Sequence, residues 1–183
     1  MYAVSDGEIR TLVVFFNDIS NSETEDGVID KSEFKKALHF HDGLFVDRMF
    51  ELFDSNADRK INFREFLQGV SMLSEKGTFE EKVKFSFRIY DHDGDAKISM
   101  SELSKMVEAS LKETGLEMSE DDVRVMLNET YKTAGNSEEG FISAAEYENL
   151  MKNNLENFMA SMTVPVRALL AQIGRSSTLA PST

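Results

Sequence analysis

The chain has 183 residues, enough to bury one or two hydrophobic cores, and its 33 acidic and 20 basic residues give a net charge of −13. This charge argues against nucleic acid as a partner and favours cations or a basic protein segment. The sequence contains no cysteine, which excludes disulfides, thiol catalysis and cysteine-ligated zinc sites.

One pattern occurs four times along the chain: an isoleucine, a glutamate four residues later, and a large apolar residue directly after it. The copies are Ile29/Glu33/Phe34, Ile61/Glu65/Phe66, Ile98/Glu102/Leu103 and Ile142/Glu146/Tyr147. Oxygen-bearing side chains crowd most of the preceding stretches, here numbered loops 1 to 4, which is typical of a calcium-binding loop between two helices. We therefore expect an all-α fold of two helix–loop–helix pairs, with short antiparallel β contacts between paired loops.

Loop 1 departs from the spacing of the others. The aromatic Phe16 precedes Ile29 by thirteen residues, whereas the corresponding separation in the later units is eleven. The loop therefore either carries two extra residues and runs from Ser20 to Glu33, or keeps twelve residues and begins at Ser22. A serine takes the first ligand position in both cases, and the sequence leaves calcium binding here open. The acidic contributors are Asp26, Asp30 and Glu33.

Loop 2 spans Asp54 to Glu65 and has the sequence DSNADRKINFRE. Its predicted calcium ligands are the side chains of Asp54, Asn56, Asp58, Asn62 and Glu65 and the main-chain carbonyl of Lys60. It has one carboxylate fewer than loop 3, and the neighbouring basic residues Arg59, Lys60 and Arg64 weaken the local negative field. We expect weaker calcium binding here than in loop 3.

Loop 3, from Asp91 to Glu102, has the fullest ligand set, in the sequence DHDGDAKISMSE. Its predicted ligands are the side chains of Asp91, Asp93, Asp95 and Glu102, the carbonyl of Lys97, and Ser99 through a water. Four carboxylates this close repel one another unless a cation lies between them. Arg59 and Ala96 stand at the sixth position of loops 2 and 3, where glycine is usual, and a left-handed non-glycine residue costs about 1–2 kcal/mol.

Loop 4 has the sequence GNSEEGFISAAE and begins with Gly135, which offers no side-chain ligand. Gly140 and Glu146 do fit the pattern, so a metal site is one interpretation. We favour the other, a loop that is kept because it pairs with loop 3.

The repeats divide the chain into an N-terminal lobe at 1–74, a hinge at 75–78, a C-terminal lobe at 79–152 and a C-terminal segment at 153–183. The last segment contains four apolar residues at the spacing of a short amphipathic helix: Val166, Leu169, Leu170 and Ile173. This helix is either a lid over a target-binding groove or a permanent part of the C-terminal lobe. Residues 175–183 are expected to be flexible and polar.

Three stretches resemble a known family. The run from Ile61 to Ser99, INFREFLQGVSMLSEKGTFEEKVKFSFRIYDHDGDAKIS, resembles calcineurin B, the calcium-binding regulatory subunit of a protein phosphatase. DISNSETEDGVIDKSEF and the following LFVDRMFELFD resemble the calcineurin B-like sensors that bind protein kinases. The resemblance covers about residues 8–152 and implies EF-hand units and a calcium sensor that docks an amphipathic segment of a phosphatase or kinase on a groove formed by both lobes. Loop 4 and the residues after 152 depart from the family pattern.

These observations favour a non-enzymatic calcium-sensing regulatory subunit, monomeric alone, that binds a protein phosphatase catalytic subunit or a protein kinase. The alternative function is a calcium buffer, which binds the ion without opening. An enzyme has little support, because the three histidines, His39, His41 and His92, have no partner at catalytic spacing. A solvated helix end explains the pair His39 and His41 better than a metal site does.

The sequence also bears on location. No apolar run approaches the roughly 20 residues of a membrane span, and the N-terminus lacks the pattern of a signal peptide. Tyr2 stands where N-myristoylation requires glycine. We expect a cytoplasmic protein without an intrinsic membrane anchor.

Overall fold

The computed structural model describes residues 6–24, 26–37, 43–134 and 140–162. In chain order its elements are α1 (Asp6–Ser20), α2 (Lys31–Ala37), α3 (Leu44–Phe53), α4 (Phe63–Leu73), α5 (Phe79–Tyr90), β1 (Lys97–Ser99), α6 (Met100–Thr114), α7 (Glu120–Ala134), β2 (Phe141–Ser143), α8 (Ala144–Lys152) and α9 (Leu155–Met162). Helices α1 to α8 form four consecutive pairs, and one of the four predicted loops lies within each pair.

The loops pair as expected. Loops 1 and 2 meet in an antiparallel bridge between Ile29 and Ile61, which exchange two N–H···O bonds of 2.9 and 2.8 Å. In loops 3 and 4, β1 and β2 pair antiparallel with Ile98 opposite Ile142. The predicted all-α fold, with two EF-hand pairs and short β contacts, is confirmed.

A single glutamate closes each of loops 2, 3 and 4 and also caps the helix that follows. α4, α6 and α8 each begin with a capping box, in which Asn62, Ser99 or Ser143 accepts a hydrogen bond from the glutamate N–H and the glutamate carboxylate accepts one from the cap N–H. The closing carboxylate is therefore fixed to the start of its helix. A movement of this carboxylate is expected to move the start of the helix with it.

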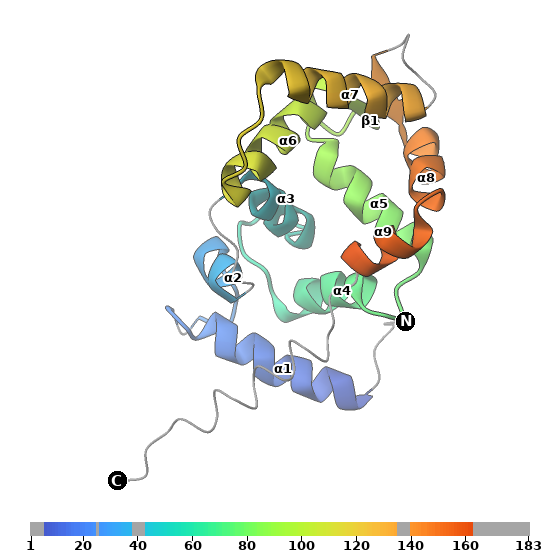
Figure 1. The fold of residues 1–183 in the computed structure, drawn as a ribbon. Helices are drawn as coiled ribbons and strands as arrows, with labels where there is room; N and C mark the ends of the chain where they lie inside the picture. Colours follow the sequence, from blue (N-terminus) through green and yellow to red (C-terminus); the bar gives the residue numbers. More distant parts are fainter. Residues whose placement is uncertain (1–5, 25, 38–42, 135–139, 163–183) are drawn as a thin grey trace.

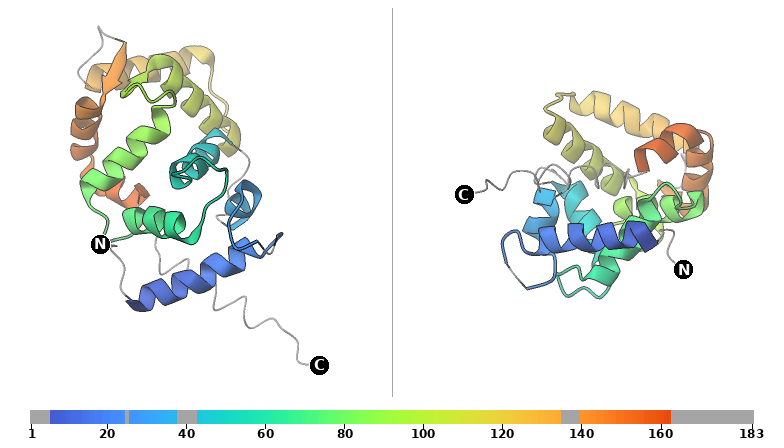
Figure 2. Two further views of the ribbon diagram at one scale, coloured as in Figure 1. Left: turned by 180° about the vertical axis from the view of Figure 1, so that it is seen from behind. Right: turned by 90° about the horizontal axis from the view of Figure 1, so that it is seen from below.

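The aromatic residues that precede the loops lie in the core, as predicted: Phe16, Phe50, Phe87 and Tyr131 are all buried. The larger hydrophobic cluster joins the first four helices with three residues of the second half, Phe85, Ile89 and Met106. Phe53 of α3 meets Phe85 of α5 edge to face, with ring centroids 6.1 Å apart and planes at 84°. The two EF-hand pairs thus share a core, with α3 and α5 between α1 at one end and α7 at the other (Figures 1 and 2). The lobe boundaries stay a prediction.

A tight turn joins α4 to α5, where the hinge is predicted. The hydroxyl of the buried Ser74 donates to the carbonyl of Ser71 at 2.8 Å, and the N–H of Gly77 donates to the carbonyl of Ser74 at 3.1 Å. A Cβ atom at Gly77 would collide with the carbonyl of Met72. Gly77 therefore permits a close backbone approach in this turn.

The helix α9 was not predicted from the sequence. It contacts α5 and α8. Met159 packs on a second, smaller hydrophobic cluster, which consists of Val83, Phe87, Ile98, Tyr131, Ile142 and Tyr147. The predicted amphipathic helix lies outside the described residues, together with its four apolar positions, Val166, Leu169, Leu170 and Ile173.

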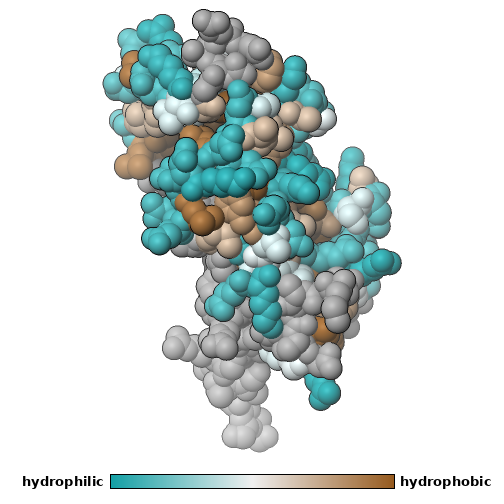
Figure 3. Space-filling model, turned by 90° about the vertical axis from the view of Figure 1, so that its right-hand side faces the viewer, coloured by the Kyte–Doolittle hydropathy of each residue, from teal (hydrophilic) through white to brown (hydrophobic). Residues whose placement is uncertain are grey.

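The face that carries α8 and α9 is largely hydrophilic, with small hydrophobic patches between the hydrophilic residues (Figure 3). Within the described part of the chain, no helix combines the length and the hydrophobicity that crossing a bilayer requires.

Candidate calcium site

Loop 3 gathers the most concentrated negative charge among the described residues. The carboxylates of Asp91, Asp93 and Asp95 each offer an oxygen, and these oxygens all lie within 4.8 Å of one another. Main-chain N–H groups hold two of them: Asp95 donates to Asp93 Oδ1 at 3.1 Å, and Lys97 donates to Asp95 Oδ1 at 2.9 Å. The loop therefore presents its carboxylates together, as an oxygen shell for a hard cation requires.

Asp91 shows directly that this loop suits a cation. The residue is 7% exposed, and its Oδ2 accepts a hydrogen bond from Ala96 N at 3.2 Å. Its buried Oδ1 has no hydrogen-bond partner among the described residues. Burial, and then the nearby charges of Glu102 and Asp95, raise the pKa of Asp91 above its usual value. A divalent cation would satisfy the buried oxygen and offset this repulsion, so the donor set fits calcium.

Glu102 is held as the closing ligand from both sides of its carboxylate. Oε1 accepts from the N–H groups of His92 at 2.8 Å and Asp93 at 3.3 Å, and Oε2 accepts from Ser99 N at 2.8 Å and Ser99 Oγ at 2.7 Å. Burial raises the pKa of Glu102, but these hydrogen bonds outweigh it and leave the pKa below its usual value. Ser99 thus positions Glu102, and its predicted contact through a water stays a prediction.

Loop 2 satisfies its own carboxylates more fully. Asp54 accepts from Asp58 N at 3.1 Å through Oδ1 and from Arg59 N at 2.7 Å through Oδ2. Asn56 Nδ2 donates to Asp58 Oδ2 at 3.0 Å. Glu65 accepts from Ser55 N at 3.1 Å and Asn62 N at 3.0 Å, as Glu102 does in loop 3. The geometry is that of loop 3 with fewer unsatisfied oxygens, and the lower affinity of loop 2 stays a prediction.

All four loops place a left-handed residue six positions before the closing glutamate. The φ angles are 74° at Gly27, 66° at Arg59, 65° at Ala96 and 73° at Gly140. Loop 2 carries a second left-handed non-glycine residue, Ala57 with φ of 58°, where loop 3 has Gly94 with φ of 75°. Loop 2 therefore contains two strained positions and loop 3 contains one.

The hydrogen bonds of loop 1 match the twelve-residue register that begins at Ser22. The buried Glu33 accepts from the N–H groups of Glu23 and Thr24, both at 3.3 Å, at the same sequence separations that Glu102 shows in loop 3. Ser20 ends α1, with its hydroxyl 3.4 Å from the carbonyl of Asn17. The two additional residues lengthen α1, and Ser20 is the last residue of this helix rather than the first residue of the loop.

A lysine from loop 2 occupies the acidic end of loop 1. Lys60 Nζ lies 2.7 Å from Asp26 Oδ2. This hydrogen bond lowers the pKa of Asp26, and the same bond raises the pKa of Lys60, which Asp58 and Asp30 raise further. Asp30 is also used locally, because its Oδ1 accepts from Glu33 N at 2.9 Å and caps α2. All three predicted acidic ligands of loop 1 therefore already have partners within the protein, and Asp26 is the one whose partner is a cation.

The first half of loop 4, residues 135–139, lies outside the described residues. In the second half, Glu146 Oε2 accepts from Ser143 N at 2.8 Å and Ser143 Oγ at 2.6 Å. β2 pairs along its length with β1. These contacts agree with a loop that pairs with loop 3, and a metal at Glu146 stays a prediction.

Comparison with known proteins decides the family. A model described as an EF-hand domain pair matches residues 80–152. Calaxin from Bos taurus is 30% identical over 154 residues, which cover 79% of this chain and 72% of calaxin. The chain belongs to the EF-hand calcium-binding family. Calaxin from Homo sapiens is 30% identical over 149 residues, 77% of this chain and 70% of that protein.

A third relative names the ion. Calcium-binding protein NCSA from Dictyostelium discoideum is 39% identical over 111 residues, 59% of this chain and 57% of that protein. Calcium is the cofactor of this EF-hand protein, and the donors of loop 3 fit it. The comparisons confirm the EF-hand, calcium-binding part of the resemblance, whereas membership of the calcineurin B group stays a prediction.

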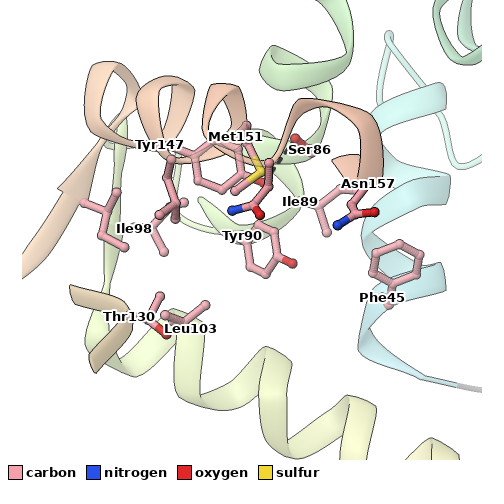
Figure 4. Close-up of a pocket in the computed structure, with 13 residues that line it drawn as sticks. Phe45, Ser86, Ile89, Tyr90, Ile98, Leu103, Thr130, Tyr147, Met151 and Asn157 are labelled. Carbon is pink, nitrogen blue, oxygen red and sulfur yellow. Dashed lines mark hydrogen bonds between the residues drawn. The ribbon is translucent and has the colours of Figure 1, made fainter. Parts of the chain in front are cut away.

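An apolar pocket of about 450 Å³ adjoins loops 3 and 4. Its lining residues come from α3, α5, α6, α7, α8 and the start of α9, and from both strands: Phe45, Ser86, Ile89, Tyr90, Ile98, Leu103, Thr130, Ile142, Tyr147, Leu150, Met151, Asn154 and Asn157. Tyr90 lies near its centre, with Tyr147 and Met151 on one side and Leu103 on the other (Figure 4). The hydroxyl of Tyr147 donates to Ser86 Oγ at 3.1 Å, which ties α8 to α5 at the pocket wall.

Sequence reasoning missed several contacts that position loop 3. The hydroxyl of Tyr131 donates to the carbonyl of Ile98 at 2.8 Å, and burial raises the pKa of Tyr131 to about 12. The ammonium of Lys97 lies 4.1 Å from the centre of the Phe141 ring. The spacing of the aromatic residues predicted that Tyr131 is buried. A buried tyrosine hydroxyl usually has a hydrogen-bond partner, and this was the one signal in the sequence for the contact with Ile98.

Proposed function

We propose that this chain is a non-enzymatic calcium sensor, a regulatory subunit that binds an amphipathic helical segment of a protein phosphatase or a protein kinase. The observation that carries the proposal is the position of the pocket. Ile98 and Ile142, the paired residues of loops 3 and 4, form part of its wall, and so does Leu103, which directly follows the closing ligand Glu102. A rearrangement of loop 3 would therefore change the shape of the pocket directly, because residues of this loop and of the helix that follows it form part of the pocket wall.

The partner's chemistry follows from the pocket and the net charge. A mostly apolar pocket accepts the apolar face of a helix, and a net charge of −13 favours a helix whose other face is basic. The resemblance of the central run to calcineurin B supports a phosphatase or kinase as the owner of this helix.

Calcium supplies a divalent charge that draws the carboxylates of a loop into one shell. In loop 3, Asp91, Asp93, Asp95, Glu102 and the Lys97 carbonyl would hold the ion, and in loop 2 the corresponding residues would hold a second ion more weakly. Because Glu102 caps α6, a movement of its carboxylate shifts α6 and with it Leu103. Loops 1 and 4 pair with these two loops.

The C-terminal segment forms part of the proposal. Asn154 and Asn157 line the pocket, and α9 continues toward the predicted amphipathic helix at 164–173. Because this segment is attached close to the pocket, its effective concentration there is high. The apolar face of its helix would therefore occupy the pocket until a target helix replaces it. Truncation after Met162 retains α9 and tests this: tighter peptide binding by the shortened, folded protein supports a lid, and unchanged binding contradicts it.

Titration with a hydrophobic dye and with a synthetic helix of leucine and lysine residues tests the sensor function. We expect both probes to bind in calcium and to dissociate in chelator. The variant Phe45→Ala should weaken peptide binding several-fold, whereas Val125→Ala, an exposed apolar residue away from the pocket, should not. Calcium binding without any gain of dye or peptide affinity would identify a buffer and contradict the proposal.

Partner identity requires a separate measurement. Capture from lysate in calcium and in chelator, followed by mass spectrometry, should recover a phosphatase catalytic subunit or a protein kinase in calcium alone. Wild-type protein and Phe45→Ala should differ in that recovery. Recovery that is equal in both conditions, or that lacks both enzyme classes, contradicts this part of the proposal.

A further inference from the structure

Arg48 of α3 reaches from the first EF-hand pair to the start of loop 3. Its Nη2 donates to the carbonyl oxygens of Arg88 at 2.8 Å and Asp91 at 3.1 Å. Its Nη1 donates to Glu51 Oε2 at 2.6 Å. The side chain is only 12% exposed, so these contacts lie mostly out of solvent.

The two carbonyls belong to the C-terminal end of α5, where helix carbonyls lack intrahelical partners and the helix dipole favours a cation. Asp91 is both the C-cap of α5 and the first predicted ligand of loop 3. Arg48 also lines a cavity of about 90 Å³ together with His92 and Glu102. One guanidinium therefore fixes the main chain that carries the first ligand and lies beside the closing ligand.

Arg48 is also rigidly connected to loop 2. The C-cap of α3 is Asp54, the first predicted ligand of that loop, whose N–H donates to the carbonyl of Phe50 at 2.9 Å. Six residues separate Arg48 from Asp54, about 9 Å along the helix axis. The edge-to-face contact of Phe53 with Phe85 holds the same helix against α5.

We propose that Arg48 is a positioning residue for calcium in loop 3, and that through α3 it makes calcium binding in loops 2 and 3 interdependent. The inference rests on the assignment of these two loops as ion sites. Calcium changes the angle between the two helices of an EF-hand. A change at loop 2 that moves α3 therefore moves Arg48 relative to the Asp91 carbonyl.

Electrostatics predicts the opposite effect on loop 3. A fixed positive charge near the site repels a second cation, so its removal alone would raise the calcium affinity. Positioning and repulsion therefore give opposite signs for the same substitution, which makes the proposal testable.

Calorimetric titration of three variants separates the two effects. Arg48→Met removes the charge and the donors and should lower the affinity of loop 3 about tenfold, the size of one charge-assisted hydrogen bond. Arg48→Lys keeps the charge but loses the planar guanidinium with its several N–H donors. The calcium affinity of this variant should lie between those of wild type and Arg48→Met. The control Glu51→Gln loses the ion pair and keeps the carbonyl contacts, so it should change the affinity less than twofold. Unchanged or higher affinity in Arg48→Met would overturn the positioning role.

Glu65→Gln, which disables loop 2, tests the coupling. In the wild-type background, Glu65→Gln should change the calcium affinity of loop 3. In the Arg48→Met background, the same substitution should have little effect on that affinity. Equal effects in both backgrounds would mean that the loops communicate by another route, and would overturn the coupling.

Amide hydrogen exchange in chelator tests the positioning role of Arg48 without bound calcium. Amide hydrogen exchange at Asp91 to Ala96 should be faster in Arg48→Met than in wild type, while exchange at Ile29 and Ile61 stays unchanged. Equal protection of loop 3 in both proteins would contradict the positioning role. Uniformly faster exchange would contradict it too, because the substitution would then lower global stability rather than release loop 3. None of these measurements uses a target, so failure of target binding and failure of this inference are distinguishable.

Discussion

The two loop pairs use a lysine at the same loop position in different ways. In the first pair, joined by the single bridge Ile29–Ile61, Lys60 crosses to the partner loop and binds the carboxylate of Asp26. In the second pair, joined by β1 and β2, Lys97 crosses to the ring of Phe141 and leaves the carboxylates of its own loop for an ion. A common scaffold thus supports an internally neutralised loop in one pair and a concentrated acidic site in the other.

The largest expected difference lies within the second pair. Loss of an outer hydrogen-bond partner lowers metal affinity about 10–100-fold, so loss of a direct ligand in Glu102→Gln should lower the calcium affinity of the tightest site about a hundredfold or more. Glu146→Gln should change it about twofold or less, because loop 4 serves pairing. Titration calorimetry measures both, and equal losses would show that the loops are ranked wrongly.

The first pair is predicted to be sensitive to packing between α3 and α4. A Cβ at Gly69 would overlap the ring of Phe53. Gly69→Ala should lower the free energy of unfolding by about 1–3 kcal/mol through overpacking. Gly7→Ala on α1, where a Cβ has open space, is the matched control and should be neutral or slightly stabilising. Urea denaturation in chelator measures both, and similar values for the two variants would contradict the close approach.

Alkaline pH should act on the second pair, where the buried tyrosine hydroxyls lie. Tyr131 has its pKa raised to about 12, and burial also raises the pKa of Tyr147 and Tyr90. A raised folded-state pKa means that the unfolded chain loses its proton first, near pH 10. The free energy of unfolding therefore falls as pH rises from about 10 to 12, by about 1.4 kcal/mol per pH unit for Tyr131, and the raised pKa values of Tyr147 and Tyr90 act in the same direction.

The variant Tyr131→Phe isolates one of these protons. Denaturation at several pH values gives the slope of the free energy of unfolding against pH. Between about pH 10 and 12 this slope should be less steep in Tyr131→Phe than in wild type, by the contribution of one proton. The first pair has Phe16 and Phe50 at the equivalent positions and contributes nothing to the difference. An unchanged slope would show that Tyr131 titrates normally.

Backbone strain should account for a smaller effect. Ala96→Gly relieves about 1–2 kcal/mol at a left-handed position and adds about 0.5–1 kcal/mol of chain entropy. The net gain is about 0 to 1.5 kcal/mol, so the calcium affinity of loop 3 should rise by up to about tenfold. The reciprocal variant Gly94→Ala should lower it, because Gly94 has φ of 75°. Shifts of the same sign in both variants would contradict the strain argument.

The smallest predicted effect concerns the exposed ion pair in the first loop pair. Lys60→Met releases Asp26 and should strengthen any ion binding in loop 1 by less than about threefold, because exposed pairs contribute little. Lys36→Met removes a lysine that lies 3.7 Å from Glu23 and is the control. Lower affinity in Lys60→Met would mean that Lys60 organises loop 1 rather than occupying it.

The repeated spacing predicted the fold, the burial of the aromatic residues and the left-handed sixth position, because these depend on local periodicity. It could not resolve the start of loop 1, since Ser20 and Ser22 carry the same side chain and only the hydrogen bonds of Glu33 distinguish them. It also missed Arg48, since a long-range contact with the carbonyl of Asp91 leaves no periodic signal. The helix α9 is short and lies outside the repeats, so no spacing indicated it.

Counting calcium ions tests most directly the claim that one loop of each pair holds an ion. Equilibrium dialysis of the wild-type protein against calcium, in the presence of magnesium, should give two ions per chain. Glu102→Gln should lose the tighter ion and Glu65→Gln the weaker one. Four ions per chain, or a loss of the tighter ion in Glu33→Gln, would contradict the account.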